Sequence, residues 1–301
     1  MVRLQSRSND AAEVSKLPPE SPVDIVTTKG NGVGKTVPRS VVVGKSGEPI
    51  PIETGLLSVL GADERKRIRD TELSPFRMIC SLRIKAPWGE FVGTGWFAGP
   101  RTVVTAGHCV FDSQQMGGWA KTIEVTPGHD GDEEPELGPY TATRFSSVDT
   151  WLESRDPDFD IGAIHLDELV GNATGWFGIG ALTDGELTNS YVNVSGYPAM
   201  PGGGRQQWWA KNRVRAVTPR RIFYDVDTSG GQSGGPVYRY ETEGGEPQVI
   251  GIHAYGIGGT PAAINLEVNS APRMIPEVVE QIRAWIADDT DKDAGATASM
   301  A

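Results

Sequence analysis

Cysteine and histidine are scarce in this sequence of 301 residues, which holds two cysteines and four histidines. Cys80 and Cys109 allow at most one intramolecular disulfide, and they cannot alone supply the four ligands of a structural zinc site. Basic residues are also few: 28 Lys and Arg stand against 39 Asp and Glu, a net charge of −11. That balance argues against the neutralisation of phosphates that nucleic-acid binding requires, so we expect no nucleic-acid partner.

Long apolar stretches are missing as well. No run of about 18 apolar residues occurs, so we expect neither a transmembrane helix nor a membrane partner. The first thirty residues carry charges and prolines without the apolar segment of a signal peptide, so no secretory signal is visible. Glycine (38) and proline (21) are plentiful and make up about a fifth of the chain. Both are unfavourable inside helices, which favours a β protein rich in turns.

The two ends of the chain differ from its middle. Residues 1–57 mix proline, glycine and charge, and no amphipathic element persists there. We expect this leader to be flexible, with 40–43 as a candidate edge strand. Residues 291–301 are small and polar and are predicted to form a flexible tail.

From residue 76 onward, short β-prone runs alternate with turn signals. They fall into two halves, about 70–170 and 175–270, which predicts a sandwich or barrels. The only helix we predict spans 276–287, where Pro276 suits the first turn. Its apolar stripe has helical spacing and consists of Val278, Val279, Ile282, Trp285 and Ile286. The β-prone runs are 78–84, 90–98, 102–106, 121–125, 160–166, 191–197, 220–226, 234–240 and 249–256.

One serine, Ser233, stands within the glycine-rich run 230–235. Glycines permit tight bends and let backbone N–H groups approach a ligand. A nucleophilic serine needs such groups because its tetrahedral intermediate carries an oxyanion, and the amides of Gly231 and Ser233 are the candidate donors. The alternative is a plain Gly/Ser loop. The run also fits G-x-S-x-G, but a strand rather than a helix follows, which excludes the nucleophile elbow of α/β-hydrolases.

The histidines differ in their surroundings. His108 follows a buried β-prone run and begins a turn of small residues that leaves room for a second side chain. Taken alone, it is more typical of a structural histidine. We expect His129, in an acidic loop, and His165, which alternates with apolar residues on a strand, to face solvent. The loop 130–136 offers oxygen ligands for Ca²⁺ but matches no EF-hand order, so we predict a solvated loop and no metal site.

A histidine that serves as general base needs a buried carboxylate to orient it. Asp160 precedes the short apolar run 161–164, which would bury it, and an unpaired buried carboxylate is costly. We therefore expect a partner for Asp160. Taken together, His108, Asp160 and Ser233 in this order are far more specific than any one of them.

With these residues the chain resembles the chymotrypsin-like serine peptidases. The motifs are TAGHC (105–109), DIGAIHL (160–166), GGQSGGPV (230–237) and GIHAYG (251–256), and the resemblance spans about 58–287. It implies an all-β fold of two six-stranded antiparallel barrels, with the active site in the cleft between them and a C-terminal helix. The implied division is a first barrel at 58–173 and a second barrel with the helix at 174–290.

Within that superfamily the chain is most similar to the bacterial glutamyl endopeptidases. The segment 58–65 looks like the mature amino terminus of those enzymes. Thr228 and His253 match positions that line their primary specificity pocket. The chemistry is suitable, because a substrate carboxylate that leaves water needs a hydroxyl donor and an imidazolium.

Some features depart from the wider family. Gln232 precedes the serine where pancreatic-type enzymes have a carboxylate for the freed amino terminus, so that zymogen switch is not expected. In the glutamyl branch the new α-amino group can help to bind the substrate side chain, and we hypothesise that removal of about residues 1–57 matures the pocket. Related enzymes often pair the cysteine after the histidine with one on the strand that leads to it. Here that strand reads GTGWF, and the candidate partner of Cys109 is Cys80 on the strand before it, which adjacent antiparallel strands could still bring into disulfide range.

The sequence thus predicts a secreted, monomeric serine endopeptidase that acts on proteins or peptides and prefers Glu, and less so Asp, before the cleaved bond. Ser233 attacks, His108 transfers the proton, Asp160 orients His108, and no metal or organic cofactor is required. One alternative is a peptidase of other specificity, because Tyr255 and the loop 256–260 could reshape the pocket. The other is a non-catalytic binding module with the same fold.

Overall fold

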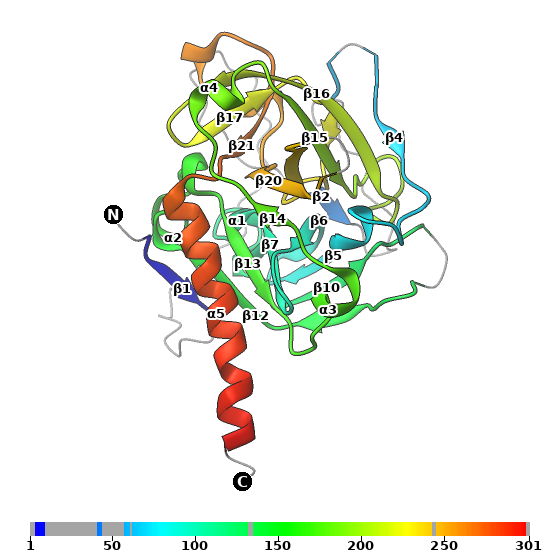
Figure 1. Ribbon diagram of the computed structural model, residues 1–301, viewed down its shortest axis with the longest axis vertical. Coiled ribbons are helices and arrows are strands. Elements are labelled where there is room, and N and C mark those ends of the chain that lie inside the picture. Colours follow the sequence, from blue (N-terminus) through cyan, green and yellow to red (C-terminus); the bar gives the residue numbers. More distant parts are fainter. Residues whose placement is uncertain are drawn as a thin grey trace.

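The computed structural model describes residues 4–9, 41–43, 57–60, 62–131, 135–242 and 245–298. Most elements are antiparallel strands that form two barrels, one drawn above the other in Figure 1. This confirms the predicted fold class.

The first barrel has six strands in the order β12-β13-β7-β6-β5-β10, and all neighbours are antiparallel. Most of its strands bury nearly every side chain; β5, which alternates buried and exposed residues in its second half, shows the pattern of a wall with one face in the core. The strands are β5 (Ile79–Ala86), β6 (Gly89–Phe97), β7 (Thr102–Thr105), β10 (Thr122–Pro127), β12 (Arg144–Val148) and β13 (Gly162–His165). Strand β11 (Tyr140–Ala142) extends the sheet beyond β10.

The second barrel has the order β20-β19-β15-β16-β17-β21. A bridge between Gly251 and Arg273 brings the first and last of these strands together and closes the barrel. The strands are β15 (Tyr191–Gly196), β16 (Trp208–Val217), β17 (Arg221–Tyr224), β19 (Pro236–Tyr240), β20 (Pro247–Ile252) and β21 (Asn269–Pro272). Two short strands, β14 (Gly178–Ile179) and β4 (Lys66–Arg67), add to β20 and β16.

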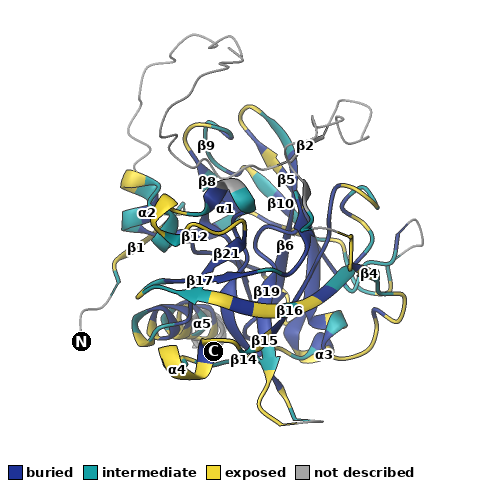
Figure 2. Cartoon of the chain, turned by 90° about the horizontal axis from the view of Figure 1, so that it is seen from above, coloured by how far each residue is buried: buried dark blue, intermediate teal, exposed yellow. Residues whose placement is uncertain are grey.

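Each barrel is filled by apolar side chains. The inner strands that carry them are coloured dark blue, for buried residues, in Figure 2. Trp96, Phe97 and Phe145 are fully buried in the first, and Val194 and Ile222 in the second. The smaller elements are β3 (Leu57–Ser58), β8 (Phe111–Asp112), β9 (Gly118–Trp119), β18 (Thr228–Ser229), α1 (Gly107–Val110), α2 (Asp149–Ser154), α3 (Gly171–Thr174), α4 (Asp184–Leu187) and four 3₁₀ turns at Phe76–Met78, Pro157–Phe159, Ile257–Gly259 and Ala262–Ile264.

The helix α5 (Pro276–Ala298) confirms the predicted C-terminal helix and exceeds it. The predicted stripe faces the core: four of its residues are buried and Ile286 is partly buried. The helix continues to Ala298, beyond the predicted end at 287, and the flexibility of residues 291–301 stays a prediction. The added residues include no proline, and Asp289 fastens this part of the helix to the first barrel, as shown below.

The leader is also more structured than predicted. The candidate strand at 40–43 is confirmed as β2 (Val41–Val43), which pairs with β6. A second strand, β1 (Ser6–Ser8), pairs with β12 and was not expected from its short polar sequence. Residues 10–40 and 44–56 lie outside the described residues. In the part of the chain that the structure describes, no helix is both long and apolar enough to cross a membrane.

Candidate active site

His108 and Asp160 lie next to the ends of two paired strands and meet at the edge of the first barrel. His108 lies in α1, directly after β7, and Asp160 directly before β13, which pairs with β7. One Asp160 oxygen accepts a hydrogen bond from the His108 backbone N–H, and the other lies 2.8 Å from His108 Nδ1. Both side chains are fully buried, so the expected partner of Asp160 is His108.

The electrostatics of this pair stabilise the imidazolium that forms when His108 accepts a proton. Burial is the largest single effect and would lower the pKa of His108. The charges of Asp160 and Cys109, together with hydrogen bonding to both, oppose burial and hold that pKa well above its ordinary value. The other ring nitrogen, Nε2, is buried and has no hydrogen-bond partner among the residues that the structure describes. The Asp160 contact favours the proton on Nδ1, which leaves the Nε2 lone pair available.

Trp151 on α2 is a neighbour of His108 that sequence reasoning missed. The two ring centroids lie 6.4 Å apart, and Trp151 Nε1 donates a hydrogen bond to the carbonyl of Phe111. A Cβ on Gly107 would lie 2.7 Å from the indole, so only glycine lets the ring pack so closely on the turn of His108. α2 thus forms one wall around the imidazole.

The Ser233 loop packs directly against the turn that carries His108. The Ser233 carbonyl accepts hydrogen bonds from the Thr94 amide (2.8 Å) and, weakly, from the Cys109 thiol (3.7 Å). Gly234 has a φ of 89°, and a Cβ there would lie 2.1 Å from the Thr105 hydroxyl. Only glycine combines this backbone angle with so close an approach.

Two amides of the loop remain available. Gln232, Gly234 and Gly235 donate their backbone N–H groups to protein carbonyls. Among the described residues, the amides of Gly231 and Ser233 have no acceptor. These are the two donors that the sequence predicts for the oxyanion.

The predicted pocket residues Thr228 and His253 are both buried. His253 is linked to the serine loop, because its N–H donates to Gly235 and its carbonyl accepts from Gly234. Its Nδ1 lies 2.7 Å from the Tyr224 hydroxyl, a contact that sequence reasoning missed. Burial, and then the charge of His108, lower the pKa of His253 to about 3. The imidazolium expected from the sequence is therefore a neutral imidazole in the unliganded protein.

Asp227, beside Thr228, is a buried acidic residue that the sequence analysis did not single out. Its carboxylate is almost fully buried and accepts the amides of Leu60 (2.7 Å) and Glu64 (2.8 Å). Just before this segment, Ser58 pairs with Thr228. The acidic side chain next to Thr228 is thus occupied by the segment 60–64.

The two cysteines are free and buried, so the predicted Cys80–Cys109 disulfide is wrong. Strand register explains this: Cys80 pairs with Gly95, whereas the Cys109 sulfur faces Gly93, two residues away along β6. A Cβ on Gly93 would lie 3.1 Å from that sulfur.

His165 does not face solvent as predicted. Its Nδ1 lies 2.8 Å from Asp289 on α5, and its Nε2 lies 2.8 Å from the Ser146 hydroxyl. Asp289 also accepts a hydrogen bond from Thr102. All four side chains are buried, and this second Ser–His–Asp group joins α5 to the first barrel.

Asp130, in the loop suggested for Ca²⁺, pairs with Arg67 at 2.8 Å. Residues 132–134 of that loop lie outside the described residues. Over the residues that the structure covers, no group of three or more His, Cys, Asp or Glu side chains could hold a metal ion.

Two antiparallel β-barrels, with a buried His–Asp pair on one and a glycine-rich serine loop on the other, define the class of chymotrypsin-like serine peptidases.

Comparison with known proteins agrees. The model of the trypsin-like peptidase domain matches residues 93–252. A Bacillus subtilis protein named extracellular metalloprotease is 35% identical over 268 residues, 88% of this chain and 81% of that protein. The glutamyl endopeptidase of Bacillus licheniformis is 33% identical over 79% of this chain and 72% of its own. A solved Glu endopeptidase superimposes with a TM-score of 0.63 at 25% identity, over 76% of this chain and 99% of that one.

The chain therefore belongs to the trypsin-like serine peptidases and is a serine endopeptidase that acts on peptides or proteins.

Proposed function

We propose that this endopeptidase works through a His108–Asp160–Ser233 triad and prefers Glu before the cleaved bond. The observation that carries the catalytic part is the buried His108–Asp160 pair with a free Nε2 beside the Ser233 loop. Ser233 Oγ attacks the scissile carbonyl and transfers its proton to Nε2. His108 then protonates the leaving amine, which leaves an acyl-enzyme that water hydrolyses through the same steps. The amides of Gly231 and Ser233 stabilise the oxyanion.

Covalent labelling tests the triad. A phosphonate directed at active serines should modify the protein once, with the adduct mapped to Ser233 by peptide mass spectrometry. Ser233→Ala should abolish both labelling and peptide hydrolysis. Labelling that persists in Ser233→Ala would disprove the assignment, and no labelling at all would favour a non-catalytic module.

The proposed preference for Glu depends on hydrogen-bond donors in the pocket. Burial raises the pKa of Tyr224 well above its ordinary value, so its hydroxyl keeps its proton and donates to Nδ1 of His253. The His253 proton then resides on Nε2 and is available, with the Thr228 hydroxyl, for a substrate carboxylate. Each carboxylate oxygen of Asp227 already accepts a backbone amide, so this side chain is less available to bind a Lys or Arg of the substrate. The Bacillus licheniformis and solved-structure relatives are named for the same specificity.

Matched peptides test the preference. Peptides that differ only in Glu, Gln, Asp, Lys or Phe before the cleaved bond should be cleaved fastest with Glu. Thr228→Val keeps the shape of the side chain and removes its hydroxyl, so kcat/KM for Glu should fall by about tenfold or more while kcat/KM for Gln changes less. Faster cleavage after Lys or Phe would contradict the pocket assignment.

We further propose that the enzyme is made as a precursor, that cleavage near Ser58 matures it, and that it acts outside the cell. Support comes from the pairing of Ser58 with Thr228 and from the hydrogen bonds of Leu60 and Glu64 to Asp227. A terminus created near Ser58 would therefore lie beside Thr228. The name of the Bacillus subtilis relative supports the location. Chains that begin at Ser58 or Val59 should cleave Glu peptides faster than the full chain, and equal turnover would contradict maturation. A mass spectrum of the protein in the culture medium would test the location and the terminus together.

A further inference from the structure

The strand β1 is an addition to the edge of the first barrel. It runs antiparallel to β12 with Arg7 opposite Ser147. The ladder continues at both ends, because the Asp149 amide donates to the Gln5 carbonyl (2.9 Å) and the Asn9 amide donates to the Phe145 carbonyl (3.1 Å). Residues 5, 7 and 9 therefore form the hydrogen-bonding edge of the segment.

Side chains of the same segment add specific contacts to β12 and α2. The side-chain amide of Asn9 donates through Nδ2 to the Thr143 carbonyl at 2.6 Å. Its Oδ1 accepts from the backbone N–H of Phe145 at 2.7 Å. Arg7 pairs with Asp149 and Glu153 on α2. The asparagine contacts fix the register of the strand on β12, because they match one residue to one position of the edge.

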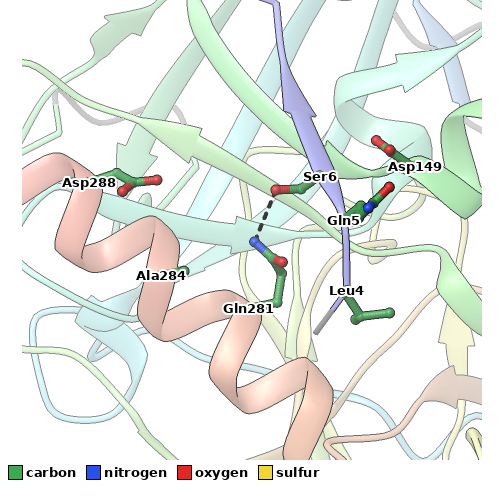
Figure 3. Close-up of a pocket in the computed structure, with 7 residues that line it drawn as sticks. All are labelled: Leu4, Gln5, Ser6, Asp149, Gln281, Ala284 and Asp288. Atoms are coloured by element: carbon green, nitrogen blue, oxygen red, sulfur yellow. Dashed lines mark hydrogen bonds between the residues drawn. The ribbon is translucent and has the colours of Figure 1, made fainter. Parts of the chain in front are cut away.

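Helix α5 forms the other side of this binding site. The Gln281 amide lies 3.0 Å from the Ser6 hydroxyl, and Figure 3 shows it pointing from α5 toward β1. When the amide is oriented to satisfy both of its polar atoms, its oxygen accepts from the Ser6 hydroxyl and its nitrogen donates to the Leu4 carbonyl at 2.8 Å. The segment is thus held between the edge of β12 and the face of α5.

Every one of these contacts joins residues 4–9 to parts of the chain beyond residue 140. The contacts are those of a peptide that adds a strand to a sheet edge, a binding mode that requires no covalent link to the sheet. β2 adds a second attachment, on β6, and two attachments on one fragment strengthen each other.

We propose that the edge formed by β12, α2 and α5 is a strand-binding site for the segment Leu4–Asn9, and that the leader stays bound there after it is cut from the enzyme. The biological setting of this inference rests on the maturation cleavage proposed above. The test of the inference does not depend on that cleavage. The mature enzyme would then be two chains held without a covalent bond. Because α2 carries Trp151 against His108, the bound leader also supports one wall of the active site.

The test imposes the cut. A recognition sequence for a site-specific protease is placed between residues 44 and 56 of the full Ser233→Ala chain, and the cut protein is analysed by size exclusion at about 100 µM and by native mass spectrometry. The leader fragment should elute with the enzyme at a ratio of one to one. Arg7→Ala should retain the fragment, since exposed ion pairs contribute little.

Arg7→Pro removes the central hydrogen bond of the strand and should weaken retention by about a hundredfold. Thermal unfolding of each uncut variant confirms that the remainder is folded. Separation of the unmodified fragment from the enzyme would overturn the proposal, as would equal retention of the Pro and Ala variants. Because the cut is imposed and the serine is absent, neither result depends on natural processing or on activity.

Discussion

At the scale of single residues, His108 is fixed by two hydrogen bonds to one carboxylate. Asp160 binds the backbone N–H and the ring Nδ1 of His108, so it holds both the turn and the imidazole. A ring bonded only at Nδ1 could still change its orientation relative to the backbone. The bond from the His108 backbone N–H fixes Asp160 relative to that backbone and so limits this movement. The imidazole is thereby held in one orientation before substrate arrives, which lowers the entropy cost of the proposed reaction.

Asp160→Asn should lower kcat by about 10⁴, because an amide favours the wrong tautomer of His108. The same change removes the largest of the effects that raise the pKa of His108 against burial. The imidazole must be neutral to accept the serine proton, so the acid limb of the pH profile should move to lower pH. The measurement is kcat/KM between pH 5 and 9 for both proteins. An acid limb that stays in place would show that Asp160 does not control this titration.

Sequence reasoning could find His108, Asp160 and Ser233 because each stands in a local pattern: the end of a buried strand, the start of another, and a glycine-rich turn. Trp151, Tyr224 and Asp227 carry no such local signal. Their roles arise from contacts across the fold, such as Asp227 with amides more than 160 positions earlier. The protonation state of His253 also escaped prediction, since it depends on burial rather than on residue type.

At the scale of elements, β6 and the turn of His108 approach each other at Gly93 without a covalent link. The gap between a Cβ on Gly93 and the Cys109 sulfur, 3.1 Å, is close to the distance of about 3 Å between a Cβ and the far sulfur of a disulfide. Gly93→Cys should therefore form a disulfide with Cys109 under oxidising conditions.

That bond would close a loop of about 15 residues and should stabilise the oxidised protein by about 3 kcal/mol relative to its reduced form. Thermal unfolding with and without reductant measures the difference. Gly93→Ala serves as the control, because it introduces the same Cβ without a sulfur. Free thiols in the oxidised variant would contradict the geometry.

Helix α5 depends on the contact of Asp289 with His165 and Thr102. Hydrogen bonds from both partners lower the pKa of the Asp289 carboxyl against the opposing effect of burial. Asp289→Ala leaves both partners buried without an acceptor and should reduce the free energy of unfolding by about 2 to 4 kcal/mol. Asp288→Ala, at an exposed neighbour, should change it by less than about 0.5 kcal/mol. Urea unfolding compares the two, and similar losses would contradict the proposed anchor.

Strands were predictable from the sequence where apolar and polar residues alternate or where apolar residues are continuous, as in β5 to β7 and β13. β12 (Arg144–Val148) was missed because two serines interrupt its pattern, and these serines are buried through hydrogen bonds that the sequence does not display. β1 was missed for a related reason. Its residues are polar, and it is a strand because the edge of β12 and α5 accepts it.

At the scale of the whole molecule, stability should depend on pH through His253. The unfolded chain protonates this residue near pH 6.5, whereas the folded protein does so only at about 3. Between these values the unfolded state binds the extra proton, so stability should fall as pH falls, by about 1.4 kcal/mol per pH unit for this group. His108 acts in the opposite direction: its raised pKa adds stability below pH 6.5 that is lost as pH rises through the folded value.

His253→Gln removes the titration while keeping an amide near Tyr224. In a Ser233→Ala background, which prevents self-digestion, the variant should be less stable at pH 7 but lose less on acidification. Urea unfolding at several values between pH 4 and 7 gives both slopes. Parallel curves for the two proteins would show that His253 is not the group responsible.

The chain has two imidazole–carboxylate pairs in which Nδ1 lies 2.8 Å from a carboxylate oxygen, His108–Asp160 and His165–Asp289. The two histidines differ in the hydrogen bonding of the other ring nitrogen, Nε2. Nε2 of His165 is hydrogen-bonded to the Ser146 hydroxyl, so both nitrogens of this ring have partners and the ring links two elements. Nε2 of His108 is not saturated by any group that the structure describes. An electrophile that reaches both rings, such as diethyl pyrocarbonate, should therefore acylate His108 and spare His165, at a pH high enough to leave His108 neutral. Reactivity in this protein follows from the contact that an imidazole lacks, and not from the carboxylate that both histidines share.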